Sequence, residues 1–333
     1  MSISIHLVSK ANQIQAGCVN YDEIIDTIVD VFKKYQDGKV LLPDKISQVF
    51  NKETQNRINC MPSTLLEEGV CGVKWVSVFP GNPVNYGIPN LSGVIILSSL
   101  ENGYPFAIMD GTLITALRTA CVGAIATKLL ANENSKVCGT IGAGEEAKMH
   151  FRFIKHVMPS IQKCYVASQT EENEQSFIDQ FKDQYTDVEF IKCCSDYRKA
   201  SSEADIIVTA VSCQQPLLKA DAIKEGAFYC HVGGWEDEYA VPLKADKIVC
   251  DNWNALKHRG SPTLARLFEK GDLTDNDIYA NLGELLTGSK PARENDKEFI
   301  YFNSIGLSFV DVAVAYSFYR KASESGFTTI WDM

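Results

Sequence analysis

The stretch Lys136-Val-Cys-Gly-Thr-Ile-Gly-Ala-Gly-Glu-Glu-Ala147 decides the fold that this sequence predicts. Residues 136–141 contain small and β-branched side chains, which is typical of a buried parallel strand, and apolar residues then recur at helical spacing from Ala147 onward. The turn between them has the pattern Gly142-x-Gly144-x-x-Ala147, the form of a dinucleotide-binding turn between strand and helix. An ordinary glycine turn is the alternative, but the flanking strand and helix favour nucleotide binding.

Each residue type in this turn suits that chemistry. Gly142 permits the tight turn, and Gly144 lets the backbone approach a pyrophosphate. The free N–H groups at the start of the following helix then face the phosphates. The predicted cofactor contacts are therefore Gly142, Ala143, Gly144, Glu145 and Glu146.

Further strands and helices alternate from residue 164 to residue 250, which predicts a doubly wound parallel sheet with ligands at the carboxyl ends of its strands. Four polar residues fall on that side and are further predicted cofactor contacts: Ser168, Gln169, Thr209 and Ser212. The second strand ends in Ser168-Gln-Thr170, without the acid that usually binds the ribose hydroxyls of NAD. No arginine stands nearby for a 2′-phosphate, so NAD and NADP both stay open, with NAD slightly favoured.

Residues 1–118 have a different pattern, with strands separated by turns that are typical of an antiparallel sheet. Alternation alone places Lys74 on the exposed face of its strand. A long helix covers residues 110–131, and Arg118 is its only charge between Asp110 and Lys128. Burying an unpaired guanidinium is costly, so Arg118 needs an anionic partner, either a structural carboxylate or a substrate carboxylate.

The segment His231-Val-Gly-Gly-Trp-Glu-Asp-Glu238 follows a later strand and places three carboxylates beside an aromatic ring. Such a loop can supply a general acid or base, and the alternative is an ordinary solvated loop. A final helix over residues 307–322 returns to the first domain. The fold class is therefore α/β: a Rossmann-type domain, residues 119–305, inserted into a discontinuous α+β domain, residues 1–118 plus 306–333.

The composition of the chain limits the classes of molecule that it is expected to bind. The 333 residues carry a net charge of −10 without a basic block, which argues against nucleic acid or an anionic membrane and favours a small-molecule substrate. Eleven scattered cysteines and the lack of a signal peptide predict reduced thiols in a cytoplasm. We see no apolar run long enough to span a membrane. Histidines and cysteines lack metal-ligand spacing, so no metal is assigned.

The whole chain resembles the ornithine cyclodeaminase/μ-crystallin family. The resemblance is carried by seven segments: 57–62 (Arg-Ile-Asn-Cys-Met-Pro), 72–75 (Gly-Val-Lys-Trp), 92–97 (Ser-Gly-Val-Ile-Ile-Leu), 114–120 (Ile-Thr-Ala-Leu-Arg-Thr-Ala), 141–144 (Ile-Gly-Ala-Gly), 282–284 (Leu-Gly-Glu) and 302–306 (Phe-Asn-Ser-Ile-Gly). The Lys-Trp pair and the run Ala245-Asp-Lys-Ile-Val-Cys-Asp-Asn-Trp253 resemble the branch of N-(2-amino-2-carboxyethyl)-L-glutamate dehydrogenases, which make 2,3-diaminopropionate for siderophore biosynthesis.

The resemblance implies a homodimer whose outer domain supplies substrate contacts and the subunit interface. It also implies a nicotinamide cofactor that exchanges hydride with the carbon bearing the substrate amine. Lys74 and Arg118 match residues that hold the substrate carboxylate and assist proton transfer, and Arg118 is also assigned to the cofactor. Glu236 matches a catalytic Asp of cyclodeaminases.

Three departures from the family pattern stand out. Glu236 is one methylene longer than that Asp, a common lysine is replaced by Ala240, and a frequent arginine is replaced by Gln48. Lys45 or Arg57 is therefore expected to contact the substrate instead.

The prediction is an NAD(P)-dependent amino-acid or opine-type dehydrogenase. It oxidises the amine-bearing carbon to an imine, which water opens. One alternative is ornithine cyclodeamination to proline and ammonia, a lyase reaction without net redox change. The other is a μ-crystallin-like cofactor-binding protein or ketimine reductase.

Overall fold

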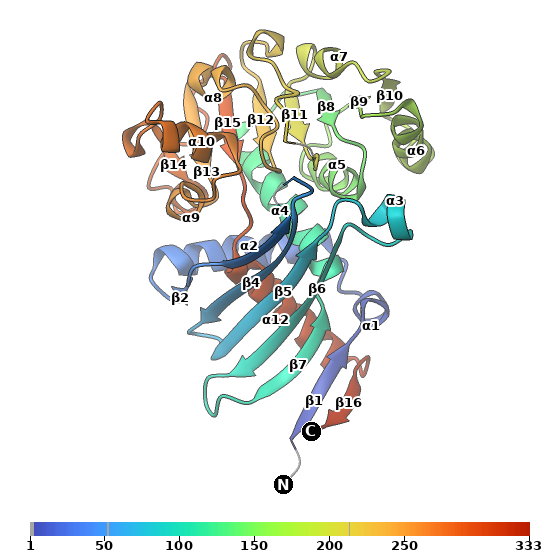
Figure 1. Cartoon of the computed structure of the whole chain (residues 1–333), viewed down its shortest axis with the longest axis vertical. Helices are drawn as coiled ribbons and strands as arrows, with labels where there is room; N and C mark the ends of the chain where they lie inside the picture. Colours follow the sequence, from blue (N-terminus) through green and yellow to red (C-terminus); the bar gives the residue numbers. More distant parts are fainter. Residues whose placement is uncertain (1–2, 52, 213) are drawn as a thin grey trace. The chain divides into compact units, whose positions relative to one another are not determined.

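A computed structural model describes residues 3–51, 53–212 and 214–333 of the chain. The chain forms two compact units (Figure 1). Unit 1 comprises residues 1–118 and 306–333, and unit 2 comprises residues 119–305. The chain therefore leaves unit 1 once, builds the whole of unit 2, and then returns.

Unit 1 contains an eight-stranded sheet with the order β16-β1-β7-β6-β5-β4-β2, in which β3 also pairs with β4. Its strands are β1 (Ser4–Val8), β2 (Val40–Leu41), β3 (Ile46–Asn51), β4 (Asn56–Leu65), β5 (Val70–Val78), β6 (Leu91–Ser99), β7 (Pro105–Asp110) and β16 (Thr329–Asp332). Neighbours pair antiparallel except β1 and β7, which are parallel. The expected antiparallel sheet is thus mixed at one edge, because β1 reaches β7 through helices and hairpins rather than a tight turn.

The helices of unit 1 are α1 (Lys10–Gln15), α2 (Tyr21–Gln36), α3 (Asn82–Tyr86) and α12 (Ser308–Glu324). Asn20 is the N-cap of α2, and its side chain accepts a hydrogen bond from the N–H of Glu23. Helix α12 packs across β4, β5 and β6 (Figure 1). It approaches β5 closely at Gly72, where an added Cβ would lie 2.7 Å from Cγ2 of Val312.

We expect Gly72→Ala to destabilise unit 1 by about 1–3 kcal/mol, because the new methyl overpacks the contact between the sheet and α12. Urea unfolding measures this change. Cys71→Ala, on the opposite face of β5, serves as the control and should change the free energy of unfolding much less. Equal losses from both substitutions would contradict the close approach of α12.

Unit 2 contains a second eight-stranded sheet, with the order β10-β9-β8-β11-β12-β15-β13-β14. Its strands are β8 (Val137–Ile141), β9 (Lys163–Ala167), β10 (Glu189–Lys192), β11 (Ile206–Thr209), β12 (Phe228–His231), β13 (Lys247–Cys250), β14 (Ala280–Asn281) and β15 (Ile300–Asn303). All neighbouring strands are parallel, and the order reverses between β8 and β11. This is the doubly wound sheet that the sequence predicted, and its switch point is where such folds bind ligands.

The remaining helical segments complete unit 2, apart from α4, which begins in unit 1. They are α4 (Thr112–Leu130), α5 (Glu145–Val157), α6 (Glu171–Phe181), α7 (Tyr197–Ser202), α8 (Ala240–Lys244), α9 (Trp253–Leu256), α10 (Thr263–Lys270) and α11 (Leu282–Leu286), with the 3-10 turns η1 (Ala220–Ala222) and η2 (Asp275–Asp277).

Helix α4 corrects one sequence expectation. It is long and apolar enough to cross a membrane by length and composition, with a mean hydropathy of 1.5, because Arg118 and Lys128 are its only charges. The expectation that no segment has these properties is therefore wrong. In this structure 72% of that apolar window is buried inside the protein, as in the core helix of a globular fold.

Candidate functional site

Unit 1 holds a buried cluster of two cations and one carboxylate. Nζ of Lys74, on β5, lies 2.7 Å from Oδ1 of Asp311 on α12, and Nε of Arg118, on α4, lies 2.7 Å from the same oxygen. Lys74 is 1% exposed and Arg118 is 6% exposed. Lys74 therefore lies on the inner face of its strand, and the exposed position that alternation alone suggested is wrong. Asp311 is the structural carboxylate that Arg118 required.

In this cluster one Asp311 oxygen accepts from two cations. Among the described residues, Nη1 of Arg118 and Oδ2 of Asp311 are buried without a hydrogen-bond partner. The guanidinium also packs against Gly306, where an added Cβ would lie 2.6 Å from Nη1. A buried guanidinium with an unused donor is suited to binding a carboxylate.

The two other predicted substrate residues lie farther along the same sheet. Arg57 pairs with Val78 in the register between β4 and β5, whereas Lys74 pairs with Met61. Four residues along a strand span roughly 14 Å. Arg57 is partly buried, its Nη1 donates to the carbonyl of Gln55, and burial lowers its pKa. Lys45 is half-buried and precedes β3.

The glycine turn in unit 2 has the geometry that a bound dinucleotide needs. Gly142 has a φ of +114°, and an added Cβ would lie 2.4 Å from the carbonyl oxygen of Ala210, so the turn after β8 passes close to the chain after β11. Gly144 is the N-cap of α5, and an added Cβ there would meet no atom within 4 Å. Glu145 and Glu146 form the first turn of α5. The open side of Gly144 is where a pyrophosphate can approach.

The other predicted cofactor residues differ in their environment. Ser168 is buried, and its N–H donates to Oε1 of Glu174 at 3.0 Å, whereas Gln169 and Ser212 are exposed. Thr209 is fully buried, and its hydroxyl is used within the protein. We therefore expect the Thr209 hydroxyl to hold Glu236 and Tyr229 in place rather than to contact a ligand.

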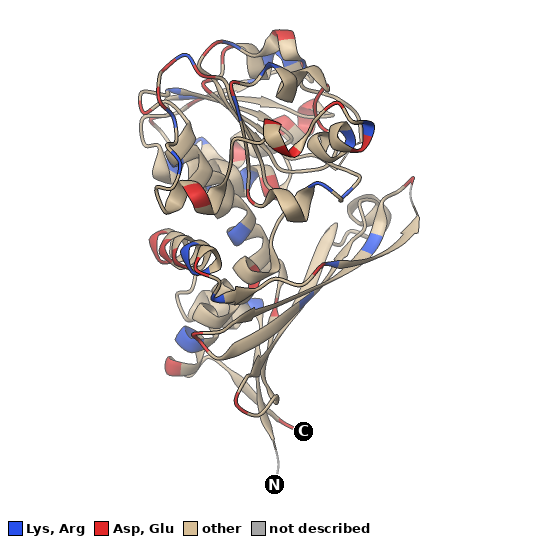
Figure 2. Cartoon of the chain, turned by 90° about the vertical axis from the view of Figure 1, so that its left-hand side faces the viewer, with Lys and Arg blue, Asp and Glu red and all other residues tan. Residues whose placement is uncertain are grey.

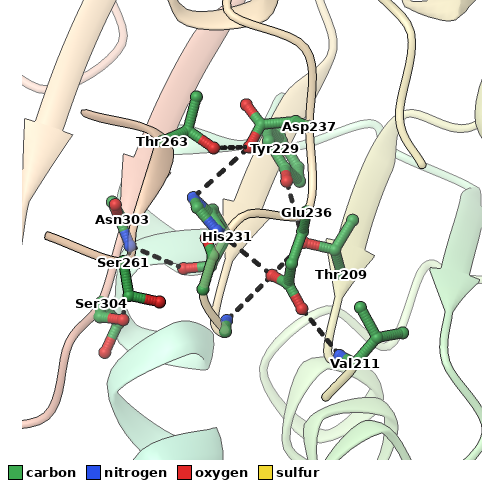
Figure 3. Close-up of polar contacts among 12 residues, drawn as sticks. Thr209, Val211, Tyr229, His231, Glu236, Asp237, Ser261, Thr263, Asn303 and Ser304 are labelled. Carbon is green, nitrogen blue, oxygen red and sulfur yellow. Dashed lines mark hydrogen bonds and ion pairs between the residues drawn. The ribbon is translucent and has the colours of Figure 1, made fainter. Parts of the chain in front are cut away.

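Glu236 lies at the carboxyl edge of this sheet and is completely buried (Figure 3). Its Oε1 accepts from the N–H of Val211 at 2.7 Å, and its Oε2 accepts from the N–H of Gly233 at 2.8 Å and from the Thr209 hydroxyl at 2.7 Å. Because Thr209 donates its only hydroxyl proton to Glu236, its other partner, the hydroxyl of Tyr229 at 2.8 Å, must be a donor. The Glu236 carboxylate thus ties together the segments that follow β11 and β12.

A second hydrogen-bonded group surrounds His231 on β12 (Figure 3). Nε2 of His231 lies 2.6 Å from the carbonyl oxygen of Gly234 and must donate to it, so in the neutral ring Nδ1 accepts from the hydroxyl of Tyr301 at 2.7 Å. Asp237 accepts from the Thr263 hydroxyl at 2.5 Å, and its Oδ2 is buried without a partner in the described chain. Nδ1 of His231 also lies 3.7 Å from Oδ1 of Asp237, so the ring lies beside this buried acid.

Burial raises the pKa of Asp237 to about 6, although the nearby His231 and the Thr263 hydrogen bond act in the opposite direction. The folded state therefore binds this proton more tightly than the unfolded chain does. Its contribution to stability is full below a pH of about 4 and is lost as the pH rises through about 6.

We expect Asp237→Asn to remove this titration. Between pH 4 and pH 7, the free energy of unfolding of the wild type minus that of the variant should fall by roughly 3 kcal/mol, as measured by urea denaturation. Asp221→Asn is the control, because a hydrogen bond from Arg198 lowers the pKa of this exposed carboxyl below 3.8, so it is ionised over most of this pH range and the difference should change little. A pH-independent difference for Asp237→Asn would show that burial leaves this carboxyl unperturbed.

Several of these residues were missed by sequence reasoning. Asp311 was not singled out in the final helix, although a lone acid among apolar residues is itself a signal. Tyr229 and Tyr301 were not singled out either. Burial raises the pKa of both phenols well above the usual value, so both stay protonated donors. No group of three metal-ligating side chains lies together in the part of the chain that the structure describes.

The family model for the ornithine cyclodeaminase/mu-crystallin family matches residues 6–326. The chain belongs to this family. It is 33% identical to an alanine dehydrogenase of Archaeoglobus fulgidus over 308 residues, covering 91% of each chain. It is 31% identical to the N-((2S)-2-amino-2-carboxyethyl)-L-glutamate dehydrogenase of Staphylococcus aureus over 284 residues, covering 85% of this chain and 84% of the relative. The resemblance seen in the sequence is thereby confirmed.

Solved structures of family members share the fold. The Δ1-pyrroline-2-carboxylate reductase of Thermococcus litoralis, solved with NADH and L-proline, superposes with a TM-score of 0.90 at 29% identity and covers 98% of this chain and 99% of its own. An archaeal alanine dehydrogenase dimer with bound NAD has a TM-score of 0.89 at 30% identity and covers 99% of both chains. The predicted fold class is confirmed by these likenesses.

Proposed function

We propose that this protein is an NAD(P)-dependent oxidoreductase that acts on the amine-bearing carbon of an amino acid or of an opine-like, N-substituted amino acid. The observation that carries the proposal is the buried cluster of Lys74, Asp311 and Arg118, in which the unused Nη1 donor of Arg118 suits a substrate carboxylate. The glycine turn of unit 2 has the form of a dinucleotide-binding turn, and the similar archaeal alanine dehydrogenase was solved with bound NAD.

The chain's residues take distinct roles in this proposal. The bound nicotinamide supplies the hydride acceptor. Arg118 pairs with the substrate carboxylate, and Lys74 polarises the reacting centre or transfers a proton. Glu236 accepts the amine proton or activates the water that opens the imine. Its three hydrogen bonds from Val211, Gly233 and Thr209 use three of the four lone-pair sites of a carboxylate, so Oε1 retains a site that can accept a proton.

The opine-like substrate class is supported by the relative that acts on N-((2S)-2-amino-2-carboxyethyl)-L-glutamate, and a role in siderophore biosynthesis goes with that substrate. We place the enzyme in the cytoplasm, where thiols stay reduced. The ten cysteines in the described part of the chain are free thiols.

The decisive experiment follows NADH absorbance while the purified protein is mixed with NAD or NADP and one of four substrates. These are alanine, proline, ornithine and N-(2-amino-2-carboxyethyl)-glutamate. Stoichiometric formation of reduced cofactor with one of them supports the proposal. Proline and ammonia formed from ornithine without net reduced cofactor would replace it with cyclodeamination. Tight nucleotide binding without any turnover would favour a cofactor-binding protein.

We expect Arg118→Lys to lower kcat/KM for the active substrate by at least about a hundredfold, because the planar guanidinium binds a carboxylate in a way that an ammonium cannot. Lys74→Met should lower kcat more than it raises KM. Binding of NADH should stay within about threefold in Lys74→Met, whereas a larger loss in Arg118→Lys would indicate that Arg118 also contacts the cofactor. Arg57→Gln is the matched control on the same sheet. If it were the more damaging change, the carboxylate site would lie at Arg57 instead.

We also propose a homodimer formed through the outer face of the unit 1 sheet. Trp75 on β5 and Val94 on β6 are register partners there and are 46% and 42% exposed. Ile96, in the same row of β6, is 36% exposed. Few charges lie on these strands (Figure 2). An exposed apolar sheet face is typical of a protein interface, and the archaeal alanine dehydrogenase is a dimer.

We expect a double substitution, Trp75→Lys with Val94→Lys, to convert the dimer into monomers in size-exclusion chromatography with light scattering, because it places like charges across an apolar contact. Exposed Tyr104, in the turn between β6 and β7, provides the control substitution Tyr104→Lys, which should leave the mass unchanged. A wild-type protein that elutes as a monomer would refute this interface.

A further inference from the structure

A buried carboxylate lies beneath the end of the second strand of the nucleotide-binding half. Glu174, on α6, is completely buried. Its Oε1 accepts from the N–H groups of Ser168 at 3.0 Å and Ser195 at 2.7 Å, and its Oε2 accepts from those of Cys193 at 3.0 Å and Cys194 at 2.8 Å. Four N–H donors use the lone-pair sites that a carboxylate offers, so the group holds two loops at once.

The second of these loops has an unusual backbone. Cys194 and Ser195 follow each other with φ values of +55° and +62°, in the left-handed region that non-glycine residues rarely adopt. Successive residues in such conformations turn their N–H groups toward one point and form an anion-binding concavity. In this protein the anion in that concavity is Glu174 itself, which offsets the cost of the strained backbone.

Glu174 lies close to the segment that binds the adenosine ribose in Rossmann folds. In Rossmann folds the adenosine ribose lies at the end of the second strand, which is β9 here, followed by Ser168-Gln-Thr170. The hydroxyl of Ser195 donates to the carbonyl of Gln169 at 3.3 Å, so the loop that Glu174 holds also supports the ribose segment. The nearby Lys192 is paired with Glu171 at 2.9 Å. The amides that could bind a 2′-phosphate are thus already bonded to a carboxylate.

We propose that Glu174 is a specificity-determining residue that fixes the ribose-binding segment and disfavours a 2′-phosphate, so that the enzyme prefers NAD to NADP. Glu174 acts through its hydrogen bonds to the loop amides, whereas in many NAD-binding folds an acid at the end of the second strand contacts the ribose directly. A negative charge one hydrogen bond away from the Ser168 amide repels a phosphate far more than it repels a hydroxyl. The proposal rests on the use of a nicotinamide nucleotide, and it is independent of which amino acid is oxidised.

The test is the binding of NADH and NADPH to the free protein, measured by calorimetry without amino acid. Wild type should bind NADH more tightly. Glu174→Gln keeps the shape of the side chain but removes its charge and turns an amide NH₂ toward N–H donors. It should weaken NADH binding and lower the ratio of the NADPH Kd to the NADH Kd by about tenfold, the expected effect of removing one nearby charge.

Glu172→Gln, on the exposed side of the same helix, removes the same charge and should change both dissociation constants less than about twofold. Glu174→Asp keeps the charge and should keep the ratio, even where binding of both nucleotides weakens. An unchanged ratio in Glu174→Gln, or a wild type that binds NADPH as tightly as NADH, would overturn the proposal. Should Glu174→Gln fail to fold, the wild-type preference alone decides. Failure to bind either nucleotide would refute the proposed function and this inference with it.

Discussion

The structure of unit 1 depends on one oxygen atom, Oδ1 of Asp311, which accepts from both Lys74 and Arg118 in the protein interior. These three residues lie on α12, β5 and α4, so a single ion group joins the last helix of the chain to a central strand and to the long apolar helix. A buried ion pair stabilises a fold only where its geometry and further hydrogen bonds offset the desolvation of the charges. Under the proposed function, the buried Nη1 of Arg118 gains such a partner from a substrate carboxylate.

Unit 2 follows a related principle at the carboxyl edge of its parallel sheet. All its strands end at the same edge, and the loops that follow leave N–H groups without strand partners. Buried carboxylates accept hydrogen bonds from several of these N–H groups. Glu174 serves the segments after β9 and β10, Glu236 those after β11 and β12, and Asp251 the N–H of Ile305 after β15. The edge where such folds bind their ligands is thus organised by charges that are themselves hidden.

Much of the fold was accessible from local sequence patterns. The strand and helix around the glycine turn and the long helix with Arg118 lie within one or two residues of their predicted places. Periodicity could not decide which face of β5 is buried, because the element that covers it, α12, lies more than 200 residues later. Lys74 was therefore misplaced by alternation, and only the family resemblance indicated its role.

The amino-acid sequence determined the family and the strand, glycine turn and helix around Gly142, because each depends on short motifs with fixed local geometry. Folding decided which charges meet. Asp311 finds its two cations, and Glu174 its four amides, only when segments distant in the chain are packed together. The free-energy cost of burying these charges and the hydrogen bonds that offset it both depend on that packing. No single stretch of sequence therefore predicts them.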